Sequence, residues 1–209
     1  MHLNPKIPKI MKKSVITILI VVGVILVLLA MMITPYNAMV KKDESCSGAW
    51  AQVENVYQRR LDLIPNLVKT VQGAADYEKG TLEAVVNARS KASSVQVDAN
   101  NLNEGSIAQF QKAQDELSSA LNRLMVVVER YPELKANQNF LELQAQLEST
   151  ENRIAVERNK FNEVVKDYNT YIRKFPNNII AGIFNFDKKG YFQATAGAEN
   201  APSVDFNFD

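Results

Sequence analysis

The chain has 209 residues, of which 46% are hydrophobic and 22% are charged, and it contains 8 glycines and 7 prolines. This composition excludes a collagen, a wholly disordered chain and a disulfide scaffold, and it fits one ordered domain with an appendage. Cys46 is the only cysteine and His2 the only histidine. One chain therefore cannot assemble a Cys/His zinc site or a Ser-His-Asp or Cys-His catalytic set. We expect no catalytic residues, no metal site and no cofactor.

The charges are unevenly distributed along the chain. The 24 Lys and Arg residues nearly balance the 23 Asp and Glu residues, but six lysines and no acidic residue precede residue 43. From residue 43 onward the chain carries a net charge of −5. Because nucleic-acid binding depends on a basic surface that neutralises phosphates, we expect no nucleic-acid partner.

An uncharged segment, SVITILIVVGVILVLLAMMIT, covers residues 14–34. At 1.5 Å per residue a helix of this length spans about 30 Å, the thickness of a bilayer core. We interpret it as a transmembrane helix that follows a short N-terminus of residues 1–13. A cleaved signal peptide has a shorter apolar region that ends in an A-x-A-like site, whereas Met31 follows Ala30 here. A lipoprotein anchor is also disfavoured, because Cys46 follows a polar Lys-Asp-Glu-Ser stretch.

The lysines on either side of this segment predict its orientation. Cytoplasmic flanks of membrane helices carry the excess of Lys and Arg. Four lysines lie in the N-terminal flank and two in the C-terminal flank: Lys6, Lys9, Lys12 and Lys13 against Lys41 and Lys42. We therefore expect a plasma (inner) membrane protein with a cytoplasmic N-terminus and an extracytoplasmic body, which is periplasmic if the cell has an outer membrane.

Apolar residues spaced alternately three and four apart predict long helices over residues 35–186. The first pattern covers residues 44–95, and Pro65 within it predicts a kink or break near residues 63–65. Long helices are stabilised by burying their apolar stripes against neighbours. The predicted fold class is therefore all-α, with a transmembrane helix followed by an elongated antiparallel bundle.

Two further helices follow a polar loop. The second begins at a capping-box signature, Ser106 with Gln109, and Pro132 ends it. The third covers residues 137–175, and the short connection makes the two a hairpin. The apolar stripe of this last helix is predicted to include Phe175.

Residues 187–209 form an extended C-terminal tail. Three apolar residues near its end alternate with polar residues, which is typical of an extended segment: Val204, Phe206 and Phe208. An all-helical body offers such a segment no sheet. We expect either an unattached terminus or docking in trans onto a second copy of the chain.

Several acidic residues lie on the predicted helices: Asp115, Glu116, Glu142, Glu148, Glu151 and Glu157. A carboxylate metal centre in a bundle normally uses Glu-x-x-His pairs, which are absent, so we interpret these residues as solvated faces. Glu157 falls within an apolar stripe, and we expect an arginine partner from Arg59, Arg60 or Arg89. The aromatic residues at helical spacing are interpreted as core and not as a cofactor site.

The run from Arg59 to Asn66 places two guanidinium groups and the Asp62 carboxylate next to Pro65. An anion site is one interpretation, and interhelical ion pairs that fix the predicted kink are the default.

Several stretches of the chain match a known family, and together they cover nearly all of residues 36–186. They include RRLDLIPNLV over 59–68, YPELKAN over 131–137, Asn139-Phe140, Phe161-Asn162 and Tyr168-Asn169. On these stretches the chain resembles the LemA family of bacterial membrane-anchored proteins. The resemblance implies one span, an elongated helical bundle, and neither enzyme activity nor cofactor. The chain departs from the family pattern in its long C-terminal extension after Phe192, and the resemblance implies no role for that extension. The motif residues that we consider for interaction are Arg59, Arg60, Asp62, Pro65, Asn66, Tyr131, Pro132, Lys135 and Asn137.

The preferred function is a non-enzymatic envelope scaffold that self-associates and organises membrane lipid or protein partners. Five valines widen the apolar stripes beyond a minimal core: Val53, Val56, Val86, Val127 and Val165. The first alternative is a monomeric binding module with a groove beside Pro65 for a peptide, protein or envelope polymer. The second is an accessory subunit of a membrane protease or transporter, and a hydrolase comes last.

Overall fold

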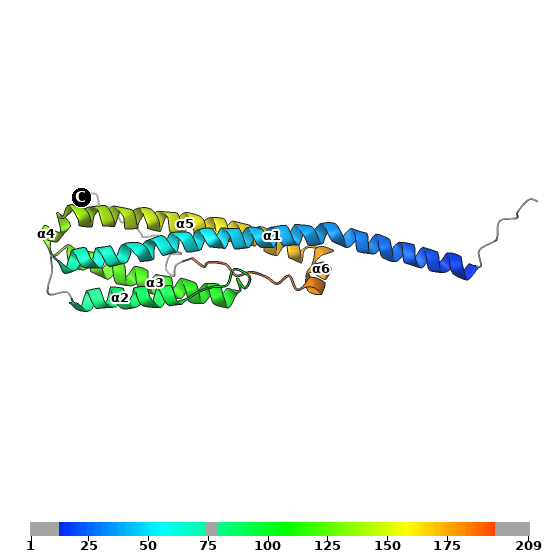
Figure 1. Cartoon of the computed structure of the whole chain (residues 1–209), viewed down its shortest axis with the longest axis horizontal. Helices are drawn as coiled ribbons and strands as arrows, with labels where there is room; N and C mark the ends of the chain where they lie inside the picture. Colours follow the sequence, from blue (N-terminus) through cyan, green and yellow to red (C-terminus); the bar gives the residue numbers. More distant parts are fainter. Residues whose placement is uncertain (1–12, 74–78, 195–209) are drawn as a thin grey trace, which may run out of the picture.

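The computed structural model describes residues 13–73 and 79–194, and within these ranges the chain forms helices and no strand (Figure 1). The helices in chain order are α1 (Lys13–Gln72), α2 (Lys79–Ser94), α3 (Glu104–Val128), α4 (Pro132–Lys135), α5 (Gln138–Arg173) and α6 (Asn177–Phe184). The predicted all-α class is confirmed.

α1 is one helix of 60 residues, and its apolar N-terminal part projects beyond the rest of the molecule (Figure 1). This part is long and apolar enough to cross a membrane. The predicted helix over residues 44–95 is wrong in its bounds. α1 starts at Lys13 and ends at Gln72, and a separate helix, α2, begins at Lys79. Of the predicted kink or break near residues 63–65, the break is wrong, because α1 is helical through Pro65.

Packing explains why α1 continues through Pro65. A proline inside a helix removes one backbone hydrogen bond. Ile64 and Leu67, on either side of it, are both fully buried, and burial of such side chains contributes about 1.5–3 kcal/mol each. Tertiary burial therefore outweighs the local cost, which a reading of the sequence alone overestimates.

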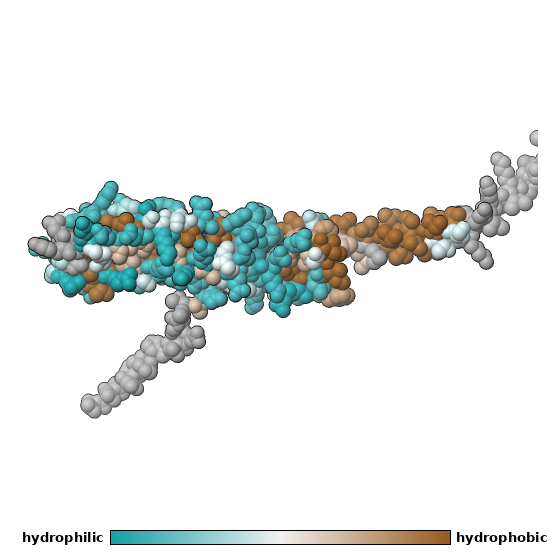
Figure 2. Space-filling view, turned by 90° about the horizontal axis from the view of Figure 1, so that it is seen from below, coloured by the Kyte–Doolittle hydropathy of each residue, from teal (hydrophilic) through white to brown (hydrophobic). Residues whose placement is uncertain are grey.

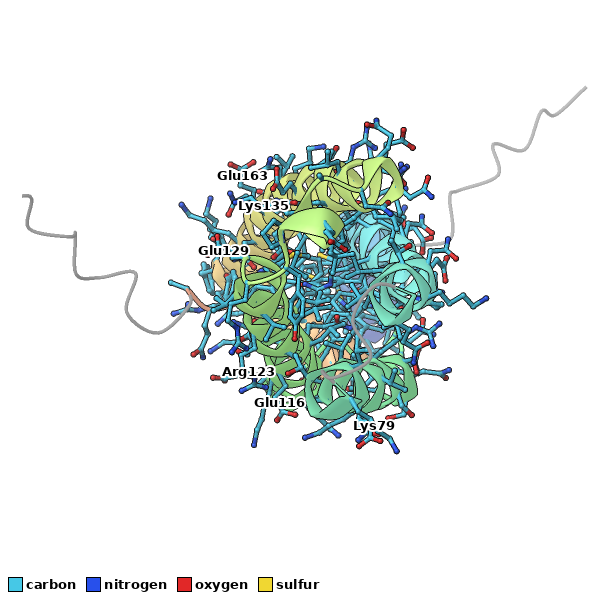
Figure 3. All side chains as sticks on the ribbon, turned by 90° about the vertical axis from the view of Figure 1, so that its left-hand side faces the viewer. Lys79, Glu116, Arg123, Glu129, Lys135 and Glu163 are labelled. Carbon is cyan, nitrogen blue, oxygen red and sulfur yellow. The ribbon has the colours of Figure 1, made fainter. Side chains whose placement is uncertain are left out.

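The second half of α1 forms a bundle with α2, α3 and α5. α1 packs mainly against α5, and α2 packs mainly against α3. Figure 3 shows this bundle end-on, with the labelled charged side chains directed away from the centre: Lys79, Glu116, Arg123, Glu129, Lys135 and Glu163. The α4 turn closes the end of the bundle that lies opposite the apolar part of α1 (Figure 1).

The interior contains two separate hydrophobic clusters. The aromatic core lies towards the apolar part of α1 and surrounds Trp50, whose ring centroid lies 5.1 Å from that of Phe110, 5.5 Å from that of Phe161 and 5.9 Å from that of Phe192. The aliphatic core lies towards α4 and contains mostly leucines, isoleucine and valines, together with Phe140. Most of the predicted stripe positions are buried in one of these cores.

Some sequence predictions fail at helix ends. α3 is capped by Asn103, whose side-chain oxygen accepts a hydrogen bond from the Ser106 amide at 2.9 Å, so the predicted cap at Ser106 is three residues late. α5 ends at Arg173, and Phe175 is 81% exposed and does not belong to the core. At its other end α5 begins at Gln138 and is capped by Asn137, so the predicted start near Asn137 is confirmed.

After α6 the chain turns back along the bundle in an extended conformation. Residues 186–194, which we call the strap, run from α6 towards the middle of the bundle (Figure 1). Phe192 of the strap is 5% exposed and belongs to the aromatic core. The residues that follow, including Val204, Phe206 and Phe208, lie outside the described residues.

Candidate functional site

The strap is held by side-chain amides that replace a neighbouring strand. Asn169 accepts a hydrogen bond from the Lys189 amide at 3.0 Å and donates to the Lys189 carbonyl at 2.9 Å. Asn162 makes the same pair of bonds with Phe192, each at 2.9 Å. Gln111 of α3 repeats the pattern with Gln193, each at 3.0 Å. These three side chains, the amide clamp, satisfy backbone groups that an extended segment leaves unpaired.

Close backbone contact and charge fix the middle of the strap. The Gly190 amide donates to the Leu102 carbonyl at 2.8 Å, and a Cβ at this position would lie 2.7 Å from the Glu104 Cα. Only glycine allows this approach to the start of α3. The buried Lys189 ammonium forms an ion pair with Asp43 of α1 at 2.6 Å. The strap thus joins α1, α3 and α5.

A second polar site lies in the middle of the bundle, between the two cores. Arg60 is 1% exposed, and its Nη2 donates to the Gln114 side-chain oxygen at 2.6 Å. Its Nη1 donates to Ser118 Oγ at 2.9 Å and to a Glu151 carboxylate oxygen at 3.1 Å. The guanidinium also lies 5.0 Å from the Tyr57 ring centre, and burial raises the pKa of Tyr57.

This arrangement, the Arg60 layer, connects α1, α3 and α5. A buried guanidinium needs hydrogen-bond partners and a counter-charge, and Glu151 supplies the counter-charge from the bundle surface, with a side chain that is 57% exposed. Arg60 is thus engaged within the chain as an interhelical ion pair, the default interpretation of its motif. Because the Glu151 side chain is more than half exposed, this ion pair is weak evidence for added stability.

The other residues of the first motif do not join Arg60. Arg59, Asp62 and Asn66 are exposed on α1, and Pro65 is half-buried. Asp62 accepts a hydrogen bond from Gln58, one turn earlier, at 2.7 Å. The structure therefore separates the two guanidinium groups of the motif, one inside the bundle and one on its surface.

The second motif forms the turn between α3 and α5. Tyr131 precedes Pro132, the first residue of α4, and the Asn137 side chain accepts the amides of Asn139 and Phe140 at 3.0 and 3.2 Å. Lys135 is exposed and points outward at this end (Figure 3). These residues have clear local roles in chain reversal and helix capping.

A Glu157 carboxylate oxygen lies 2.8 Å from Lys160 Nζ and forms an ion pair with it, so the prediction of an arginine partner for Glu157 is wrong. Arg89 instead donates from Nε to the Leu61 carbonyl at 2.8 Å. Another of the acidic residues, Glu116, accepts a hydrogen bond from Lys91 that lowers its pKa. Across residues 13–73 and 79–194, no group of three or more His, Cys, Asp or Glu side chains is placed to hold a metal ion.

Several shallow grooves cross the described surface, and one of about 750 Å³ lies between α2 and α3. Another, of about 680 Å³, lies between α1 and α5, and its lining combines Val56, Ala145, Ser149 and Val156 with the charged Glu148, Arg153 and Glu157. A third, of about 410 Å³, lies between α1 and the chain around the end of α2, and its lining reaches Gln114. These grooves offer a partner both apolar and polar groups.

Comparison with known proteins now decides the family. The sequence model of the LemA family matches residues 49–206. The chain belongs to the LemA family. This match extends past Phe192, so the departure inferred there from the sequence is wrong. The strap is part of the family region.

Several curated proteins are moderately similar to this chain in sequence. The magnetosome protein MamQ 2 of Paramagnetospirillum magneticum is 28% identical over 198 residues, which cover 86% of this chain and 71% of MamQ 2. MamQ of Magnetospirillum gryphiswaldense is 28% identical over 75% of this chain and 64% of its own length. The protein LemA of Metamycoplasma hominis is 23% identical over 76% of this chain and 69% of its own length.

The LemA resemblance contained a signal for the amide clamp. Asn162 and Asn169 stand in the Phe161-Asn162 and Tyr168-Asn169 pairs that carried the resemblance, seven residues apart and next to buried aromatic residues. Burying two asparagine side chains beside a hydrophobic core costs free energy unless their amide groups form hydrogen bonds. The glycine at Gly190 adds a third sign of close backbone contact.

Proposed function

We propose that this protein is a non-enzymatic, single-pass membrane scaffold whose bundle self-associates. The observation that carries the proposal is the continuity of α1, which passes from the apolar segment into the bundle without a break. A helix of 60 residues spans about 90 Å, of which about 30 Å lies in the membrane. The bundle is therefore a stiff rod coupled directly to its anchor, a form suited to spacing and organising partners.

Self-association is assigned to the groove between α1 and α5. Val156 is 50% exposed there and lies beside half-buried Val56. Ala145 and Ser149 are small, so a second helix can approach closely. Three of the five valines in the widened stripes, Val53, Val127 and Val165, are buried within the chain itself. They offer nothing to a partner, which leaves Val56 of that set beside the groove.

The expected topology belongs to the same proposal. The lysine distribution favours a cytoplasmic N-terminus and an extracytoplasmic bundle in the plasma membrane. With Cys46 replaced by alanine, a cysteine at Val126, which is 66% exposed, should react with a membrane-impermeant thiol reagent added outside the plasma membrane. Reaction only after that membrane is opened would place the bundle in the cytoplasm.

Membrane lipid and further copies of the chain are the proposed partners, together with envelope proteins that the sequence does not identify. The tail residues Val204, Phe206 and Phe208 are proposed to dock in trans onto a second copy. Deletion of residues 201–209 should then reduce the size or the dissociation temperature of the oligomer. An unchanged oligomer would leave the tail without this role.

A monomeric binding module is the second candidate, and the groove of about 410 Å³ that reaches Tyr57, Leu61 and Gln114 favours it. The two functions differ in oligomeric state. Full-length protein in detergent should form a discrete oligomer by light scattering under the scaffold proposal and a monomer under the alternative.

A pair of matched variants tests the proposed interface. Val156→Glu places a charge in the α1–α5 groove and should dissociate the oligomer. Val86→Glu, at a valine that is 47% exposed on α2, is the control and should leave its mass unchanged. Equal masses for both variants would exclude this groove as the interface.

A further inference from the structure

The short helix α6 carries an exposed apolar face. Four large side chains before and within it are exposed: Phe175 at 81%, Ile179 at 54%, Ile183 at 57% and Phe184 at 47%. Figure 2 shows hydrophobic residues gathered over this end of the bundle, next to the hydrophobic rod of α1. We call these four residues the α6 face. A cluster of this kind marks an interaction site more often than isolated exposed residues do.

The opposite side of α6 fixes its position beside α1. Ile180 and Ala181 are each 6% exposed and pack in the aromatic core with Met39. The Phe184 ring lies 4.8 Å from the ring of Tyr36. Tyr36 follows the apolar segment of residues 14–34 by two positions, so α6 lies level with the point at which α1 would leave a bilayer.

Basic residues lie at both ends of the α6 face. Arg173 and Lys174 immediately precede Phe175, Lys188 follows α6, and all three are exposed. Asp187 is the one exposed acidic residue between Arg173 and Lys188. An apolar face bordered by basic residues is the pattern of a segment that lies in the interface of an anionic membrane.

We propose that the α6 face inserts into the interfacial region of the bilayer that α1 crosses, with the acyl-chain boundary around Phe175, Ile179 and Ile183. The inference rests on the proposed membrane span of α1. It goes beyond the scaffold role because it gives the bundle a second membrane contact. Two contacts fix the tilt of the rod, whereas α1 alone allows the bundle to lean.

Lipid is favoured over a second protein copy by the position of the face. It is continuous with the apolar surface of α1 at Tyr36, which is itself an amphipathic residue typical of a membrane boundary. Any occupant of the α6 face must therefore lie at the depth of the lipid headgroups. In that position lipid is already present at high local concentration.

Depth-dependent fluorescence quenching tests this proposal on the full chain. The protein, with Cys46 replaced by alanine, is reconstituted into vesicles of phosphatidylethanolamine and phosphatidylglycerol that contain lipid with a nitroxide high on the acyl chain or, in a parallel sample, near the end of the chain. An environment-sensitive fluorophore is attached at Ile179→Cys, at Val126→Cys and at Val24→Cys in separate samples. Val126 is exposed on α3 near its end at the α4 turn, and Val24 lies in the apolar segment.

We expect several-fold stronger quenching and a blue-shifted emission at position 179 relative to position 126. Quenching at position 24 with none at position 179 would overturn the inference and leave the span intact. No quenching at position 24 would overturn the span, and the inference with it. Energy transfer between differently labelled copies at position 179, without lipid quenching, would show a second copy on the face and would also overturn the proposal.

A second arm tests the basic residues and the apolar face separately. Replacing phosphatidylglycerol with phosphatidylcholine should reduce the quenching at position 179 and leave that at position 24 unchanged. Equal quenching in both vesicles would contradict the role of Arg173, Lys174 and Lys188. Ile183→Asp should lower the quenching at position 179, whereas the same quenching in this variant would show that the apolar face does not insert. Retention of helical circular dichroism checks the fold in each case.

Discussion

Asn169 and Lys189 exchange two hydrogen bonds, one in each direction, between a side-chain amide and a backbone peptide group. Both residues are buried, at 6% and 8% exposure. The side chain of one helix residue therefore does for the strap what a neighbouring strand does in a sheet. This exchange explains how an extended segment can belong to an all-helical protein.

The first prediction removes one arm of the amide clamp. Asn169→Ala leaves the Lys189 N–H and C=O without their partner, which should lower the free energy of unfolding by about 1–3 kcal/mol. Trp50, the only tryptophan, lies fully buried in the aromatic core, so its fluorescence during urea unfolding reports the change. Asn159→Ala, at an exposed position of the same helix, should stay within about 0.5 kcal/mol. Equal effects would show that the clamp adds nothing.

A second prediction concerns the approach of the strap to α3. At Gly190 an added Cβ would lie 2.7 Å from the Glu104 Cα and 2.8 Å from its nitrogen, which are backbone atoms that cannot turn aside. Gly190→Ala should therefore destabilise the fold by about 1–3 kcal/mol, the usual cost of overpacking. Gly182→Ala is the matched control, because nothing lies within 4 Å of a Cβ there. Its helical position in α6 should make alanine neutral or slightly stabilising. Similar thermal unfolding of the two variants would argue against close contact at Gly190.

The Arg60 layer gives a third prediction. Gln114→Leu removes the side-chain partner of Arg60 Nη2 and should cost about 1.5–3 kcal/mol, as expected for a hydrogen bond to a buried charge. Glu151→Gln should cost less than about 1 kcal/mol, because the Glu151 side chain is 57% exposed and solvent screens its charge. The opposite order, measured by denaturant unfolding, would place the main support of Arg60 at the bundle surface.

The fourth prediction is a pH dependence at Cys46. Burial raises the pKa of its thiol from 9.0 to about 11, because the core disfavours the thiolate. The folded state keeps this proton at a pH at which the unfolded state has lost it. Stability is therefore full below about pH 9 and decreases as the pH rises towards about 11. Cys46→Ala should flatten this decline in urea midpoints. An unchanged slope would assign the decline to other groups, such as Tyr57 and Tyr168, whose pKa values burial also raises.

Periodicity was sufficient to predict the all-α class and the long helices, but not that α1 ends at Gln72 and a separate helix, α2, begins at Lys79. The stripes of apolar residues gave the long helices, and Asn137 was identified as the start of the last long helix, because repeat spacing and caps are local signals. Pro65 misled the prediction since the cost of a proline is local, whereas the burial of Ile64 and Leu67 that offsets it depends on other helices. The prediction that Phe175 belongs to the core was wrong because the apolar spacing continues in the sequence beyond Arg173, where α5 ends.

The candidate sites were predictable only in part. Arg60 belongs to a motif that the sequence singled out, and the local signal for its burial was its spacing, three residues after Tyr57 and four before Ile64, which Arg59 does not share. The clamp was missed because its three amides come from α3 and α5 and meet the strap only in the folded chain. Asn162 and Asn169, at a seven-residue spacing, were the available local signal.

The central claim is that the bundle self-associates, and the mass of the assembly extracted from native membranes tests it most directly. Native mass spectrometry of the full chain, released in mild detergent, should give one discrete mass that is a multiple of the 23.4 kDa chain. A single species at 23.4 kDa over the accessible concentration range would contradict the claim and favour the monomeric binding module.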